Sequence, residues 1–153
     1  MKDIFIDNNI ACRFSNPMDP EMVKLINWLV FSNKGDKAIL VVSKKLLEEY
    51  CASSIGAKSE TAIPSIINTL IIEGRLNIVS KQQIEQFKND YFSKARINKM
   101  RSNAEDRDHI PVVLLSDRKY ALTNDSNFTY DLNHFPGFTV LVSNRPELIP
   151  YGE

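Results

Sequence analysis

Two short apolar runs, one near each end of the chain, stop abruptly close to an acidic residue. Residues 4–6 run directly into Asp7, and residues 120–122 are followed three positions later by Asp125. Short apolar runs of this kind are typical of buried strands, whose last residues lie at the carboxyl edge of a sheet. In an open α/β sheet, the strands that flank the reversal of strand order end at one crevice. We therefore expect Asp7 and Asp125 to face each other across it.

Apolar runs alternate with helical patterns along the whole chain. The predicted strands are residues 4–6, 38–42, 76–79, 120–122 and 138–142. The predicted helices begin near Pro20 and Ser43, span 59–73 and 80–101, and include a last one that ends near Asp117. Residues 13–17 and 126–137 are expected to be loops. This alternation predicts a three-layer α/β/α sandwich with a mostly parallel, five-stranded sheet, formed by one domain over residues 1–153.

Capping and breaking residues set the expected helix boundaries. Asp19, followed by proline, is a typical helix start, and Ser80 opens a capping-box pattern. Ser43 is expected to cap the helix after the second strand. Gly35-Asp36 is expected to break the pattern between the first long helix and that strand.

Charge and cysteine content narrow the classes of function. Nineteen basic and nineteen acidic residues give a formal net charge of zero, so attraction to a polyanion requires a local patch. Cys12 and Cys51 are too few for a disulfide framework or a zinc site, and we expect both to be buried thiols in a reducing compartment. With no basic and apolar leader, and no apolar run near the roughly 18 residues that span a bilayer, we expect a cytoplasmic protein without membrane contact.

Acidic residues recur at positions that an α/β fold brings to one edge of the sheet. They are Asp7, Glu48 or Glu49, Asp106 or Asp108, and Asp125. Two carboxylates about 4 Å apart repel by about 4 kcal/mol at an effective dielectric of 20, and a divalent cation removes that repulsion. Oxygen ligands without nearby cysteine favour Mg²⁺ or Mn²⁺ over zinc or copper. Such an ion suits phosphodiester hydrolysis, because it polarises a phosphate oxygen and lowers the pKa of an attacking water.

Each acid also has a purely structural interpretation. Asp7 and Asp125 are ordinary residues for a turn after a strand, Asp108 is a suitable helix cap, and Glu48 or Glu49 suits a solvated helix face. Only the gathering of all of them at one edge favours a shared site.

Other chemistries of carboxylate or serine residues fit the sequence less well. A phosphatase with an aspartyl nucleophile would need a second Asp where Asn9 stands. The five glycines are not clustered into a phosphate-binding loop, and no glycine-flanked serine elbow is present. We expect His109 and His134 to be surface or hydrogen-bonded histidines rather than catalytic ones.

A basic cluster lies at the end of the predicted helix 80–101. It comprises Lys94, Arg96, Lys99 and Arg101. In isolation the cluster is explained by the helix dipole, which favours cations at the last turn, and contact with nucleic acid is the alternative.

The acidic segments resemble, in order, the motifs of PIN-domain ribonucleases. The segments are residues 4–9, 42–50, 106–110 and 122–128, and the similarity covers nearly the whole chain. The resemblance implies a parallel five-stranded α/β/α fold and a nuclease that depends on Mg²⁺ or Mn²⁺ and cuts single-stranded RNA. Some members of the family are toxins of bacterial toxin–antitoxin pairs.

The resemblance also implies roles for individual residues. The implied metal-binding and catalytic acids are Asp7, Glu49, Asp106 and Asp125. The supporting polar residues are Asn9, Thr123, Asn124 and Asp108, and the implied RNA-binding cations are Arg13, Lys94, Arg96, Lys99 and Arg101. Two departures from the family pattern are Asn8, where the family often has Thr, and Pro111, which shortens or bends the helix that follows Asp106.

The sequence thus leads to one principal hypothesis and one alternative. The principal hypothesis is a metal-dependent endoribonuclease whose partners are RNA and, for a toxin, an antitoxin protein. The alternative is a non-cleaving domain of the same fold that binds RNA or a protein. The apolar face of residues 59–73 suits either the core or a homodimer interface.

Overall fold

A central parallel sheet organises the protein, for which a computed structural model describes residues 2–32 and 37–153. The five strands lie in the order β3-β2-β1-β4-β5, and every pairing between neighbours is parallel. The strands are β1 (Lys2–Ile6), β2 (Ala38–Val42), β3 (Leu76–Ile78), β4 (Tyr120–Leu122) and β5 (Leu141–Ser143). The predicted parallel α/β architecture is confirmed.

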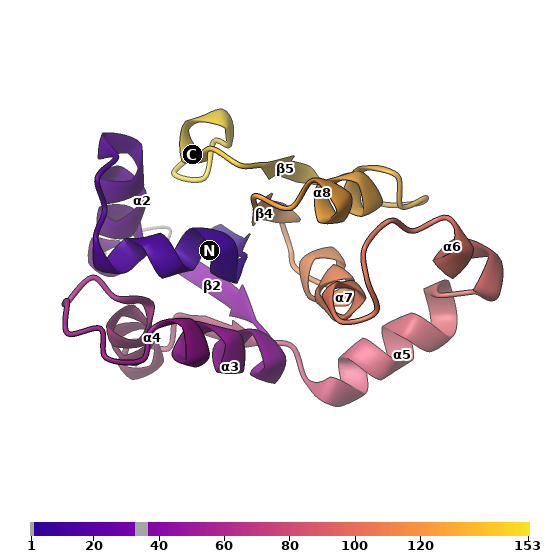
Figure 1. The fold of residues 1–153 in the computed structure, drawn as a ribbon, viewed down its shortest axis with the longest axis horizontal. Coiled ribbons are helices and arrows are strands. Elements are labelled where there is room, and N and C mark those ends of the chain that lie inside the picture. The colour runs from indigo at the N-terminus through magenta and orange to yellow at the C-terminus, as the bar shows by residue number, and fades with distance from the viewer. Residues whose placement is uncertain (1, 33–36) are drawn as a thin grey trace.

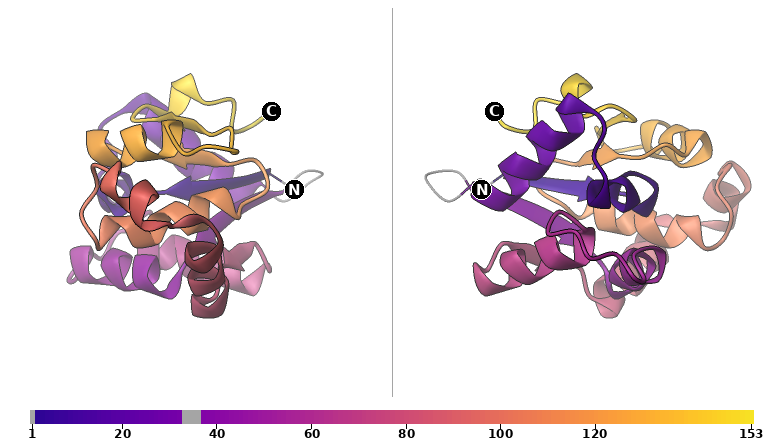
Figure 2. Two further views of the ribbon diagram at one scale, coloured as in Figure 1. Left: turned by 90° about the vertical axis from the view of Figure 1, so that its right-hand side faces the viewer. Right: turned by 60° about the vertical axis from the view of Figure 1, so that its left-hand side comes forward.

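Helices cover both faces of this sheet (Figure 1). On one face, α2 (Pro20–Phe31) and α3 (Lys44–Ser53) contact α4 (Ile63–Ile72). On the other, α7 (Ile110–Leu114) contacts α5 (Lys81–Tyr91) and α8 (Ser126–Asn133). Figure 2 shows the two layers from different sides. In the left view, α7 and α8 (orange) lie toward the viewer, and in the right view, α2 (purple) and α4 (magenta) do. Right-handed crossovers between parallel strands require this division.

The central strand explains why the sheet must be covered on both sides. Ile4, Phe5 and Ile6 of β1 are fully buried, as are Leu40, Val41 and Val42 of β2. A strand with both faces apolar is stable only between two layers of helices.

The expected caps are present at three helices. Asp19 Oδ1 accepts a hydrogen bond from the backbone N–H of Glu21 at 2.9 Å, and Ser43 Oγ accepts one from Leu46 N at 3.1 Å. Ser80 forms the complete capping box that begins α5. The break assigned to Gly35-Asp36 lies outside the described residues.

The helix predicted over residues 59–73 begins later, at Ile63. Ala62 is the residue before the first turn and Pro64 lies within that turn, where proline needs no hydrogen-bond partner for its nitrogen. The buried face of α4, including Ile66 and Leu70, packs in the core, whereas Ile72 is exposed.

The single helix predicted over residues 80–101 is wrong. α5 ends at Tyr91, and a separate short helix, α6, spans Lys94–Asn98. Ser93 Oγ accepts a hydrogen bond from Arg96 N at 3.1 Å and so begins a new helix. Lys94 therefore lies at the start of a helix, and the dipole explanation for the basic cluster does not apply to it.

The loop predicted over residues 126–137 is also wrong, because most of it forms α8. Asp125 begins this helix: its Oδ1 accepts hydrogen bonds from Asn127 N at 2.9 Å and Phe128 N at 3.1 Å. The last strand is correspondingly shorter than predicted and begins at Leu141.

Short helical segments occupy three other stretches of the chain. The chain after β1 forms α1 (Asn8–Ala11) and the 3-10 helix η1 (Cys12–Ser15), where a loop was expected over 13–17. The helix expected to end near Asp117 consists of the 3-10 helix η2 (Asp106–His109) followed by α7, with Pro111 in the first turn of α7. A last 3-10 helix, η3, spans Pro146–Leu148.

The prediction that the two cysteines are buried is wrong. Cys12 and Cys51 are free thiols and both are exposed. Among the described residues, no helix combines the length and the apolar character needed to cross a bilayer.

Candidate functional site

Asp7 lies at the junction of β1 and α1, as the strand pattern predicts. Its Oδ1 accepts a hydrogen bond from Asn8 N at 2.8 Å, and its backbone N–H donates to the carbonyl of Leu122 at the end of β4. Its Oδ2 accepts a bond from Thr123 Oγ1 at 2.6 Å. Strand pairing and capping together therefore fix the orientation of this carboxylate.

Thr123 links the end of β1 to the end of β4. Its hydroxyl, which donates to Asp7, accepts a hydrogen bond from the backbone N–H of Asp125 at 3.1 Å. A second link runs from Asn124 N to Asn9 Oδ1 at 3.0 Å. The two strand-end segments, 116 residues apart along the chain, thus share one hydrogen-bond network.

Glu49 approaches the same region from α3 and is held there by a histidine. His109 Nε2 lies 2.8 Å from Glu49 Oε2, and the imidazole is only 3% exposed. The ring packs beside Phe5 and Phe128, with centroid separations of 5.9 and 6.4 Å. Its Nδ1 is buried and has no hydrogen-bond partner among the residues that the structure describes. His109 is therefore a buried residue that fixes Glu49, a role that the sequence did not reveal.

The charges of the four acids act on one another. Burial raises the pKa of Asp106, and the carboxylates of Asp125, Asp7 and Glu49 raise it further. Burial also raises the pKa of Asp7, although the hydrogen bond from Thr123 and the charge of His109 oppose this effect. The four acids, which come from separate parts of the chain, therefore interact electrostatically.

Asp108 and Glu48 lie in different surroundings from Asp106 and Glu49. Asp108 Oδ2 forms an ion pair with Lys45 Nζ at 2.9 Å, and its other oxygen pairs with Lys88. Burial raises the pKa of Asp108, but these two cations outweigh burial and hold it below the ordinary value. Glu48 lines the same lysine-rich hollow as Asp108. Asp106 and Glu49, rather than their neighbours, are therefore the acids that interact electrostatically with Asp7.

Hard oxygen donors make this site suitable for Mg²⁺ or Mn²⁺. Within residues 2–32 and 37–153, no three His, Cys, Asp or Glu side chains are close enough to hold a metal ion in their present positions. Mg²⁺ is usually held by only one or two carboxylates and keeps several waters. The carboxylate of Asp7 and the neighbouring acids supply oxygen donors of the kind that this mode of binding requires.

Two further residues that sequence reasoning missed buttress this corner. The Tyr50 hydroxyl donates to the carbonyl of Ile6, and Ser53 Oγ donates to Asn8 Oδ1 at 2.8 Å. Burial raises the pKa of Tyr50 well above its ordinary value, and the charges of Asp7 and Glu49 add to this. Both residues lie on α3. Ser53 lies four positions after Glu49, so helical spacing was an available signal for Ser53, whereas it gives none for Tyr50, which directly follows Glu49.

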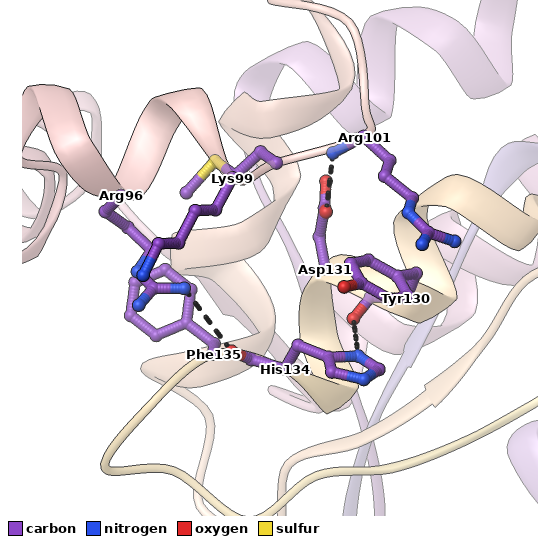
Figure 3. A pocket seen from close by; sticks show the side chains of 8 residues that line it. Arg96, Lys99, Arg101, Tyr130, Asp131, His134 and Phe135 are labelled. Atoms are coloured by element: carbon purple, nitrogen blue, oxygen red, sulfur yellow. Dashed lines mark hydrogen bonds between the residues drawn. The ribbon is translucent and has the colours of Figure 1, made fainter.

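The five predicted RNA-binding cations separate into distinct places. Arg96, Lys99 and Arg101 line one pocket together (Figure 3). Lys94 is not among the residues that line this pocket, and Arg13 lines a separate hollow between η1 and the start of α2.

Comparisons with known proteins identify the fold. No family model and no curated protein matches the sequence. A matching solved structure is that of VapBC2 from Rickettsia felis bound to a DNA fragment from their promoter. The match covers 94% of this chain and 98% of the matched chain, with 13% identity and a TM-score of 0.58. At this identity the similarity shows a shared fold, and the five-stranded parallel architecture is the one that the PIN-domain resemblance implies.

Proposed function

We propose that this protein is a metal-dependent endoribonuclease that hydrolyses phosphodiester bonds in single-stranded RNA. The observation that carries the proposal is the electrostatic coupling among four acids: burial raises the pKa of Asp106, and the charges of Asp125, Asp7 and Glu49 raise it further. Acids that disfavour each other's ionisation are poised to receive a cation. The fold shared with the VapBC2 chain and the PIN-domain resemblance support the same function.

Each acid has a defined part in this proposal. Asp7 offers the best-oriented carboxylate, because Thr123 and Asn8 both donate hydrogen bonds to it. Asp125 Oδ1 caps α8, and no hydrogen bond from the described residues 2–32 and 37–153 engages its Oδ2. Glu49, held by His109, and Asp106 complete the oxygen shell directly or through water.

A bound Mg²⁺ or Mn²⁺ would polarise a phosphate oxygen and lower the pKa of the attacking water. The chain's own contribution is to orient the acids, through the hydrogen bonds to Asp7 and the contact of His109 with Glu49. The raised pKa values of Asp7 and Asp106 predict that metal binding weakens as the pH falls, because these carboxyls then gain protons.

The proposal is tested with labelled single-stranded RNA and purified protein in Mg²⁺, Mn²⁺ or EDTA. We expect cleavage with either metal and none in EDTA. Asp106→Asn should reduce cleavage at least about tenfold, whereas Asp108→Asn, two positions away, should leave it within about twofold of wild type. Cleavage that survives EDTA, or that is lost equally in both variants, would contradict the assignment of the site.

A non-cleaving binding domain is the second candidate function. It is favoured by the absence, within the described parts of the chain, of three ligands already close enough to hold a metal. Wild-type protein that binds the labelled RNA but does not cut it in Mg²⁺ or Mn²⁺ would establish this alternative.

The proposed partners are RNA and an antitoxin protein. The antitoxin follows from the PIN-domain resemblance and from the fold shared with a chain of VapBC2. We expect expression of wild-type protein alone to arrest growth, and Asp7→Asn protein to be tolerated. Co-expression with the product of an adjacent small gene should relieve the arrest. Unimpaired growth on expression of soluble, cleaving protein would contradict a toxin role.

A further inference from the structure

A second polar pocket lies between α6 and the C-terminal half of α8, away from the four acids. Its volume is about 530 Å³, within the range of pockets that hold small ligands. Its lining combines cationic and aromatic side chains: Arg96, Lys99, Met100, Arg101, Tyr130, Asp131, His134 and Phe135. Figure 3 shows these side chains arranged around one hollow.

Aromatic and guanidinium groups form a continuous stack along one side of the pocket. The Arg101 guanidinium carbon lies 3.5 Å from the centroid of the Tyr130 ring, and the His134 ring is stacked on Tyr130 at 3.8 Å. Two groups this close to one centroid must occupy opposite faces of the ring. The order is therefore Arg101, Tyr130, His134, and the outer face of the exposed His134 ring ends the stack.

The cations of the pocket are not neutralised by carboxylates of the described residues. In the part of the chain that the structure describes, no carboxylate forms an ion pair with Arg96, Lys99 or Arg101. The one carboxylate of the lining, Asp131, is buried and accepts the backbone N–H groups of Arg101 and Ser102, both at 2.8 Å. Asp131 thus anchors the segment after α6 to α8, and the cationic side chains face the pocket.

The stack is also held in place from below. His134 Nδ1 lies 2.8 Å from the carbonyl of Tyr130, and Arg96 donates to the carbonyl of His134 at 3.4 Å. Rings fixed by their own backbone contacts lose little conformational freedom when a ligand stacks on them.

We propose that this pocket binds a single-stranded RNA, with one base stacked on His134 and backbone phosphates held by Lys99 and Arg101. Flat cationic and aromatic surfaces bind unpaired bases irrespective of sequence, and nearby cations hold the backbone. A neutral protein that binds a polyanion needs such a local site. The inference rests on the proposed function, because it takes the RNA of that reaction as its ligand.

The pocket lies where one single-stranded RNA would contact both the pocket and the four acids. Asp125 begins α8, and Tyr130 lies five residues further along, a rise of about 7.5 Å along the helix axis. A single strand cleaved beside Asp125 would therefore reach the stack after a short run of nucleotides. The pocket would then fix the position of the RNA without contacting the bond that is cut.

The test measures binding of a labelled single-stranded RNA by fluorescence anisotropy in EDTA, so that affinity is separated from cleavage. His134→Ala should weaken binding at least about fivefold, the smallest effect typical of losing one stacked base. The double variant Lys99→Gln with Arg101→Gln should weaken it at least about tenfold. For the double variant, the slope of log affinity against log salt concentration should fall in magnitude by about 1.4, which corresponds to two lost phosphate contacts.

A matched control removes two cations elsewhere. The double variant Lys24→Gln with Lys58→Gln changes exposed lysines outside the pocket by the same total charge and should bind RNA as wild type does. Thermal unfolding of each variant establishes that it is folded.

The outcomes for the pocket and for the nuclease are separable. Wild-type affinity in both pocket variants would overturn the pocket, whether or not the protein cleaves RNA. Reduced affinity in those variants would support it even where no cleavage is found. Poly-glutamate serves as the comparison ligand: if His134→Ala weakens its binding as much as that of RNA, the pocket recognises acidic protein and the inference is wrong.

Discussion

Two groups of charged side chains differ in how the fold holds them: the carboxylates that follow β1 and β4, and the cations beside α8. Asp7 and Asp125 are bound by backbone N–H groups and by Thr123, so strand pairing and helix capping fix them. Lys99 and Arg101 extend from the end of α6 and the segment after it, which Asp131 anchors to α8, and the Arg101 guanidinium rests on the Tyr130 ring. The difference indicates that the acidic side chains are fixed by backbone contacts, whereas the side chains of Lys99 and Arg101 can change conformation without breaking a backbone hydrogen bond.

The largest effect is expected at Asp7. Asp7→Asn removes a charge but keeps a residue that caps α1, and should reduce Mn²⁺-dependent cleavage by more than about 100-fold. Because burial raises the pKa of Asp7, ionisation of this group costs stability above that raised pKa and costs nothing below the ordinary value of 3.8. At pH 7 the variant should therefore melt at the wild-type temperature or higher.

Both quantities are measured on the same preparation, by RNA cleavage and by thermal unfolding at several pH values. The difference in melting temperature should shrink as the pH falls toward 3.8. Undiminished cleavage by the variant would show that Asp7 is only a capping residue.

An intermediate effect is expected at Thr123, which touches Asp7 but carries no charge. Thr123→Val removes the 2.6 Å hydrogen bond that lowers the pKa of Asp7, so that pKa should rise further. Cleavage should fall about 10- to 100-fold, and the acidic limb of its pH profile should move to higher pH. Thr129→Val is the matched control, because that hydroxyl donates to the carbonyl of Asp125 within α8 and should leave the profile unchanged. Superimposable profiles for the Thr123 variant and wild type would refute this role.

Replacement of Asp131, the carboxylate of the pocket, should lower the free energy of unfolding, whereas replacement of Asp7 should not. Asp131 accepts two backbone N–H groups, and Asp131→Asn replaces one acceptor by a donor. The variant should lose about 1.5 to 3 kcal/mol of unfolding free energy, measured by chemical denaturation. Asp90→Asn on the exposed face of α5 should change it by less than about 0.5 kcal/mol. Equal stability of the two variants would remove the contrast between anchoring and functional carboxylates.

The smallest effect is expected at Asp108, whose ion pairs are partly exposed. Lys45 and Lys88 hold the pKa of Asp108 below its ordinary value, so this pairing stabilises the fold above that ordinary value and is lost as the pH falls through the lowered pKa. Asp108→Asn should cost less than about 1 kcal/mol at pH 7, and high salt should shrink the cost. A salt-independent loss of several kcal/mol would show that this pair is more than a surface contact.

Sequence patterns were sufficient for the features that depend on local periodicity. The runs 4–6 and 38–42 had to be buried strands because both of their faces are apolar, and that fixed the parallel sheet. Asp7 at the end of one strand followed from the same pattern. The PIN-domain resemblance then distinguished Glu49 from Glu48 and Asp106 from Asp108, and the surroundings of these residues differ in the same way.

The features that were missed depend on tertiary contacts or on competing local signals. The pairing of His109 with Glu49 joins residues 60 positions apart, and no periodicity encodes it. Residues 126–133 appeared to be a loop because Ser, Asn and Asp are common in turns, yet Asp125 caps a helix there. Ser93 interrupts an otherwise helical pattern by capping α6, and that break places Arg96 and Lys99 beside α8.

The proposed function requires that the acids after β1 and β4, together with those of α3 and η2, gather around a hard divalent cation. The most direct measurement is a crystal structure grown with Mn²⁺, in which anomalous scattering locates the ion. We predict a peak bonded to the carboxylate of Asp7 and surrounded, directly or through water, by Glu49, Asp106 and Asp125. Ordered Mn²⁺ elsewhere on the protein, with none bonded to Asp7 at saturating concentration, would contradict the account.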